Sequence, residues 1–87
     1  MNNYIEKWNY TDVTTRIKAL RKKGNHSLTW ACMKLQELDY ITSESTLCKY
    51  ENGRITIPLE FIVICCRLYG CSVEYLLFGK EDNPPLH

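Results

Sequence analysis

The stretch TSESTLCKYENGR, residues 42–54, carries the signals for both ends of one short helix. Ser43 can cap the helix, because its side-chain oxygen can accept a hydrogen bond from a free amide of the first turn. Leu47 is the main apolar anchor, and Gly53 can adopt the left-handed conformation that ends a helix near Tyr50. Taken alone, this pattern is either a recognition helix for DNA or an ordinary capped surface helix.

Two further helices precede this stretch. The first is expected to be capped by Thr11 or Asp12, to run to about Lys23 and to stop at Gly24. Its apolar face is formed by Val13, Ile17 and Leu20. The second follows a possible cap at Ser27 and repeats apolar residues at helical spacing, namely Ala31, Leu35 and Leu38. Helices 2 and 3 are then joined by a brief turn, which is the arrangement of a helix-turn-helix.

Two more helices follow residues 42–54. Pro58 is tolerated in the first turn of a helix over residues 58–70, which is apolar nearly all round and is therefore expected at the buried centre. Ser72 can cap a last helix over residues 72–79. The sequence thus predicts one compact all-α domain of five helices at residues 11–79. An aromatic arm, residues 1–10, and a polar, proline-rich tail, residues 80–87, flank it.

The composition is that of an ordinary globular protein, since 45% of the 87 residues are hydrophobic and 24% are charged. No apolar run approaches the roughly 20 residues that a bilayer span needs. The first ten residues also lack the features of a signal peptide, so we expect a cytoplasmic protein. One domain in 87 residues leaves no room for an effector-binding or self-cleaving module, so we expect no small-molecule effector.

The sequence favours neither a metal site nor a catalytic site. Its five cysteines have no recurring spacing and are expected to be reduced: Cys32, Cys48, Cys65, Cys66 and Cys71. Cys65 and Cys66 lie in an apolar helical run and are expected in the core, whereas Cys48 is expected to be a plain small residue on helix 3. We therefore expect no zinc and no other cofactor. His26 and His87 lie in a loop and in the tail, and no nucleophile and base are paired, so we expect no enzyme.

The basic residues are concentrated, although the formal net charge is only +1. Five of the eleven stand between positions 16 and 23 with no acidic residue among them: Arg16, Lys18, Arg21, Lys22 and Lys23. This stretch is either a solvated helix face or an edge that faces phosphates.

Four segments in order, RIKALRKKG, SLTWACMKL, SESTLCKYENGR and PLEFIVICCRLYGCSVEYLLFG, resemble the Cro and phage-repressor (XRE) family of helix-turn-helix domains. The resemblance runs from about Val13 to Gly79, most of the chain. It implies a lambda-repressor-like fold and a sequence-specific DNA-binding regulator, in particular a repressor that blocks polymerase. It also implies a homodimer that reads a palindromic operator in double-stranded DNA with helix 3 in the major groove.

The resemblance assigns roles to single residues. Glu44, Ser45 and Lys49 match the positions that reach base edges, with Lys49 suited to guanine. The residues implied to lie along the DNA backbone are Ser43, Thr46, Asn52, Gly53, Arg54 and Arg21. An ion pair between Arg21 and Glu51 is implied as a structural element.

Three departures from the family pattern lower the expected number of phosphate contacts, and affinity with it. Leu28 stands where relatives often have a glutamine that holds a phosphate. The turn QELDYIT is longer than usual and lacks the customary glycine, and RITI, residues 54–57, replaces a link that is often rich in bases. A second hypothesis, favoured by the near-zero net charge, Leu28 and Glu44, is a protein-interaction module on the same fold, either antitoxin-like or with a decayed DNA face.

Two sets of aromatic residues are candidates for a dimer contact. Tyr4, Trp8 and Tyr10 of the arm either cover the core of the domain or join two copies of it. Tyr75 and Phe78 of the last helix are the other candidates.

Overall fold

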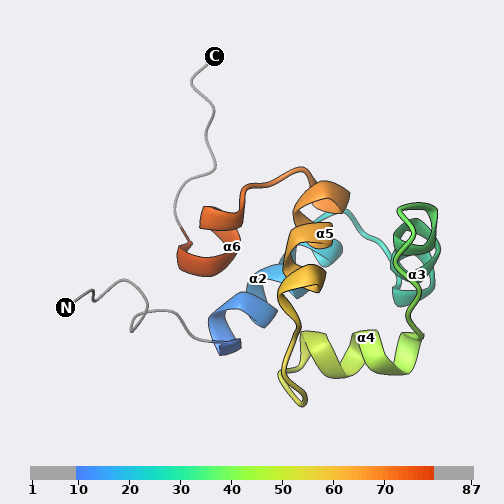
Figure 1. Cartoon of the computed structure of the whole chain (residues 1–87), viewed down its shortest axis with the longest axis horizontal. Coiled ribbons are helices and arrows are strands. Elements are labelled where there is room, and N and C mark those ends of the chain that lie inside the picture. Colours follow the sequence, from blue (N-terminus) through green and yellow to red (C-terminus); the bar gives the residue numbers. More distant parts are fainter. Residues whose placement is uncertain (1–9, 80–87) are drawn as a thin grey trace.

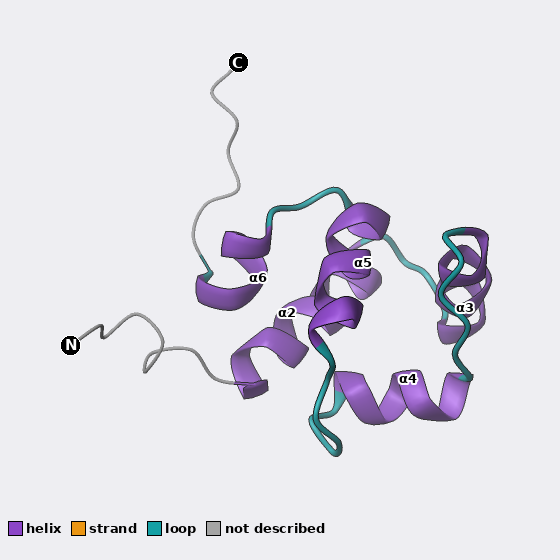
Figure 2. Cartoon of the chain, viewed as in Figure 1, coloured by secondary structure: helices purple, strands orange, loops and turns teal. Residues whose placement is uncertain are grey.

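The computed structural model describes residues 10–79 (Figure 1). In this part of the chain there are five helices and no strand (Figure 2), which confirms the all-α prediction. The helices are α2 (Tyr10–Lys23), α3 (Leu28–Glu37), α4 (Glu44–Glu51), α5 (Leu59–Tyr69) and α6 (Val73–Phe78). Residues 1–9 of the predicted arm and the predicted tail, residues 80–87, lie outside the described residues.

Helix α5 is at the centre of the arrangement. It contacts α2, α3 and α6, and Figure 1 shows it between α6 on one side and α3 on the other. Helix α4 contacts α2 and α3 and lies along one edge of the molecule, roughly across the direction of α5. This position leaves one long side of α4 uncovered by the other described helices.

Every helix contributes to one hydrophobic core, as does the link before α5. The buried members are Val13, Ile17, Ala31, Leu35, Leu47, Ile57, Phe61, Ile62, Cys65 and Leu76. At its centre the ring of Phe61 lies 4.5 Å from the ring of Tyr50 and 5.7 Å from that of Tyr40, measured between centroids. Because Tyr50 belongs to α4 and Tyr40 to the turn before it, this aromatic cluster attaches the helix-turn-helix to α5.

Three of the five helices begin with the serine caps that the sequence predicted. In each, the serine side-chain oxygen accepts a hydrogen bond from the amide three residues further on: Ser27 from Trp30, Ser43 from Thr46 and Ser72 from Tyr75. Each bond satisfies an amide that has no partner within the helix, and this is why the three starts were readable from local sequence.

Helix α2 differs from the prediction at both ends. It begins at Tyr10, so Thr11 and Asp12 lie inside its first turn and do not cap it. At the other end the left-handed residue is Asn25, with φ of 62°, and not Gly24. The amides of Asn25 and the next residue close the helix on the carbonyls of Lys22 and Arg21, a motif that puts the left-handed residue one place beyond the C-cap, here Gly24.

Helix α5 is less buried than its composition indicated. Pro58 is its N-cap, with extended backbone angles, and not a residue of the first turn. Phe61 and Ile62 are buried, but Leu59 is 69% exposed and Val63 is 45% exposed. Helix α5 is central, as the sequence predicted, but part of its surface is exposed, because α2, α3 and α6 cover only part of its circumference.

The turn between α3 and α4 is shorter than expected and is made without glycine. Helix α3 continues to Glu37, so residues 38–43 form the connection. Asp39 adopts a φ of 67° and takes the left-handed position that glycine usually fills in such turns. The amide of Tyr40 then bonds to the carbonyl of Leu35 at 2.8 Å, which ends α3 and brings Tyr40 to the core.

Candidate nucleic-acid interface

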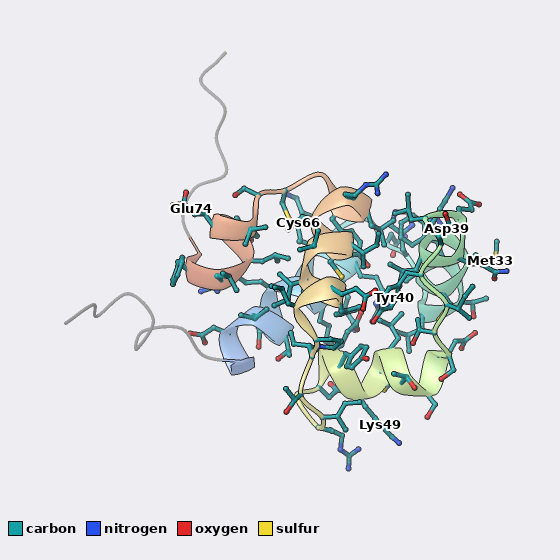
Figure 3. All side chains as sticks on the ribbon, viewed as in Figure 1. Met33, Asp39, Tyr40, Lys49, Cys66 and Glu74 are labelled. Atoms are coloured by element: carbon teal, nitrogen blue, oxygen red, sulfur yellow. The ribbon has the colours of Figure 1, made fainter. Side chains whose placement is uncertain are left out.

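Helix α4 has a buried face and an exposed face. Leu47 and Glu51 are buried, whereas Glu44, Ser45 and Lys49 are exposed. Figure 3 shows Lys49 on the outer edge of α4, pointing away from the other helices. Of the residues predicted to follow the DNA backbone, Thr46 is half-buried and four others are exposed: Ser43, Asn52, Gly53 and Arg54. The structure therefore exposes the predicted base-contacting residues and most of the predicted backbone-contacting residues, all of them on α4 or at its two ends.

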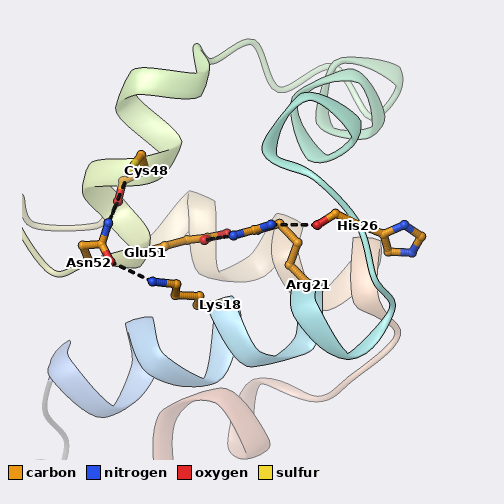
Figure 4. Close-up of polar contacts among 6 residues, drawn as sticks. All are labelled: Lys18, Arg21, His26, Cys48, Glu51 and Asn52. Carbon is orange, nitrogen blue, oxygen red and sulfur yellow. Dashed lines mark hydrogen bonds and ion pairs between the residues drawn. The ribbon is translucent and has the colours of Figure 1, made fainter.

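A buried ion pair fixes the inner side of α4. The Arg21 Nε and Nη2 atoms donate to the two carboxylate oxygens of Glu51, each at 2.9 Å, and Nη1 donates to the carbonyl of His26 at 2.7 Å (Figure 4). This hydrogen bonding to Glu51 raises the pKa of Arg21. Arg21 is only 7% exposed, so its guanidinium joins α2, α4 and the turn after α2. This burial leaves Arg21 little surface for the phosphate contact that the resemblance also implied for it.

The basic stretch of α2 does not form one phosphate-facing edge. Arg16 donates to the carbonyl of Leu76 in α6 at 2.8 Å, and Arg21 is buried beside α4. Successive residues of a helix turn by about 100°, so neighbouring bases are sent to different sides. Of the five, Lys18 contacts the end of α4, and Lys22 and Lys23 are exposed.

Asn52 is held in place at the end of α4. Its side-chain amide donates to the carbonyl of Cys48 at 3.0 Å, and its oxygen accepts from Lys18 Nζ at 3.1 Å (Figure 4). A surface hollow of about 380 Å³ lies here, lined by Thr14, Thr15, Lys18, Glu51, Asn52 and Gly53. Lys18 was not singled out by the sequence reading, and no local signal marks it among its basic neighbours.

Glu44, at the start of α4, has a partner within the protein. Its Oε2 atom accepts a hydrogen bond of 2.7 Å from the hydroxyl of Thr29, in the first turn of α3. This contact ties together the first turns of the two helices of the helix-turn-helix. Sequence reasoning missed Thr29, because a lone threonine fifteen positions from its partner carries no recognisable pattern.

The Ser43 cap is expected to stabilise the interface helix measurably. Its oxygen accepts from the amide of Thr46 at 3.1 Å, so Ser43→Ala should lower the free energy of unfolding by about 1 kcal/mol. Urea unfolding without DNA measures this. Ser45→Ala, at an exposed position in the first turn of α4, is the matched control and should change the value by less than about 0.5 kcal/mol. Equal losses in both variants would contradict a specific role of the cap.

Two helices in contact, a tight turn between them and a free polar face on the second define the helix-turn-helix class of DNA-binding domain. The sequence model of the family described as "Helix-turn-helix domain" matches residues 12–76, and the chain belongs to this family. No match to the chain was found among curated proteins or among solved structures. Within residues 10–79 no helix has the length and hydrophobicity to span a membrane.

Proposed function

We propose that the chain is a transcription regulator of the Cro and phage-repressor (XRE) kind, which inserts α4 into the major groove and represses by occupying an operator. The observation that supports this most is the outer face of α4. It carries exposed Ser45 and Lys49 and continues into Arg54, while the Arg21–Glu51 pair fixes its inner side. A rigid helix with a free polar face suits direct readout of base edges.

Lys49 is the base-reading residue with the clearest chemistry, since its ammonium can donate to O6 and N7 of guanine. Ser45 can donate or accept and discriminates weakly. Glu44 uses one oxygen to accept from Thr29, and its remaining acceptor capacity suits the amino group of a cytosine.

The proposed backbone contacts are Ser43, Thr46, Asn52, Gly53 and Arg54, with Lys18 replacing Arg21 as the cation from α2. Lys18 Nζ is 3.1 Å from the side-chain oxygen of Asn52, so its ammonium stands at the end of α4, where a phosphate can accept from it. Leu28 is packed against the core and offers phosphate no donor. Few cations face the DNA, so we expect modest affinity and a shallow salt dependence.

The proposed target is a palindromic operator bound by a homodimer. Two copies of α4 would then enter successive major grooves about 34 Å apart. Such pairing offsets the small number of contacts that each subunit makes.

The test is a comparison of Lys49→Ala with Lys34→Ala. Lys34 is the matched control, because its ammonium pairs with Glu37 on α3 at 3.4 Å. Duplexes from beside the gene and a random-sequence duplex are titrated at two salt concentrations. Lys49→Ala should weaken binding to the preferred duplex by about 1–3 kcal/mol and reduce its preference over random DNA, whereas Lys34→Ala should change little.

Two results would count against the proposal. If both variants lose affinity equally on every duplex, α4 does not read sequence. If the unaltered protein binds no duplex at low salt, the DNA face is not functional, and the protein-interaction module becomes the better hypothesis.

A further inference from the structure

One side of α5 presents an apolar strip beside a hollow. Leu59 is 69% exposed and Val63 is 45% exposed, one turn apart on the helix. The adjoining hollow has a volume of about 510 Å³, and Leu38 and Tyr40 from the α3–α4 turn line its other side. The same surface therefore carries both a protruding apolar side chain and a cavity that could receive one.

The two ends of this strip carry opposite charges. Glu60 stands in the first turn of α5 and Arg67 in its last turn, and both line the same hollow as Val63. Val63 lies close to midway between them in sequence. An antiparallel copy of this strip would set each charge against its opposite, which is the self-complementarity that a two-fold interface requires.

We propose that this face of α5 is the contact between two copies of the chain, with the helices antiparallel about a two-fold axis near Val63. Glu60 then pairs with Arg67 of the partner subunit, and Leu59 enters the hollow of the partner. This proposal rests on the proposed function in one respect: it names the surface through which the proposed homodimer forms.

The opposite charges of Glu60 and Arg67 favour a second copy over a peptide of one sign, and Asp39, which also lines the hollow, adds a second carboxylate that can face Arg67 of the partner subunit. A peptide of one sign would leave either Glu60 or Arg67 facing a like charge. The earlier candidates on α6 are less available, since Tyr75 is packed against the core and Phe78 is half-buried.

The first experiment measures self-association of the full chain without DNA by sedimentation velocity over a range of concentrations. Val63→Glu would put two carboxylates together at the two-fold axis and should raise the dissociation constant about tenfold or more. Val73→Glu is the matched control. Val73 is 38% exposed but lies on α6, so the dissociation constant of the dimer should be the same in this variant as in the unaltered protein. An equal effect of both variants, or an unaltered protein that is monomeric at every concentration, would overturn the proposal.

The second experiment exchanges the charges. The Glu60→Arg protein and the Arg67→Glu protein should each self-associate more weakly than the unaltered chain, because each substitution places like charges across the two-fold axis. An equimolar mixture of the two should form heterodimers, and the double variant should regain self-association. All these positions are exposed, so circular dichroism should show unchanged folding. A mixture that associates no better than either variant would overturn the proposal.

The two proposals can fail separately. Dimers formed through α5 that bind no duplex would support this interface and count against DNA binding. A chain that reads an operator with Val63→Glu as well as without it would overturn the interface and leave the proposed function standing.

Discussion

Arg21→Ala and Glu51→Ala should each lower the free energy of unfolding by about 3–5 kcal/mol. Glu51 is 4% exposed, and removing either partner leaves the other as a buried, unpaired charge. Arg21→Ala also leaves the carbonyl of His26 without this donor. Because a small domain has a total stability of about 5–15 kcal/mol, either variant should be close to unfolding.

Urea unfolding followed by circular dichroism measures this loss, and the exposed pair of Lys34 and Glu37 is the matched control. Its side chains are 41% and 62% exposed, so Glu37→Ala should cost less than about 1 kcal/mol. Joint replacement of Arg21 by Met and Glu51 by Leu should recover most of the stability, because no charge is then left buried. A Glu51→Ala protein as stable as the Glu37→Ala protein would show that the ion pair does not hold α4.

Phe61→Ala should also destabilise the protein by about 3–5 kcal/mol. Phe61 has no exposed surface, and its ring contacts those of Tyr40 and Tyr50. Truncation leaves a cavity where α5 meets α4 and the turn before it, and it also removes two favourable aromatic contacts.

Thermal and urea unfolding test this expectation, with Leu59→Ala as the control. Leu59 stands two positions away on the same helix but is 69% exposed, so its truncation should cost less than about 0.5 kcal/mol at concentrations where the protein is monomeric. Phe61→Leu should fall between the two, since it keeps most of the apolar volume. If Phe61→Ala and Leu59→Ala were equally stable, the aromatic cluster would not be the attachment of the helix-turn-helix.

Local sequence determined the helices and their order, because the signals for them act within a few residues. The oxygens of Ser27, Ser43 and Ser72 bond to amides only three positions away. Leu47 is buried because helical periodicity places it on the inner face of α4, and Gly53 ends α4 with a φ of 70° because glycine carries no side chain to oppose it. Each of these signals lies within a few residues of the feature it produces, so the features can be read from local sequence.

The left-handed residues show the limit of such reading. A glycine was the expected stop after α2, and the turn after α3 was noted for lacking one. In the structure Asn25 and Asp39 adopt the left-handed conformation at these two places. Asparagine and aspartate tolerate the left-handed region at a moderate cost, and burial of the neighbouring residues can offset that cost. Their use therefore depends on packing as well as on local preference.

Apart from the Arg21–Glu51 pair, which the family resemblance implied, tertiary structure decided what the charged residues do. The bonds of Lys18 to Asn52, of Thr29 to Glu44 and of Arg16 to Leu76 join positions 15 to 60 apart in the chain. The basic run of α2 looked uniform, but successive helix positions turn by about 100°, so its members diverge. Arg16 contacts α6, Lys18 and Arg21 contact α4, and Lys22 and Lys23 are exposed. The exposed side of α5 was likewise not evident from a segment that is apolar at nearly every position. The face of such a helix that stays exposed depends on which other helices pack against it, and the sequence pattern of the helix does not specify those neighbours.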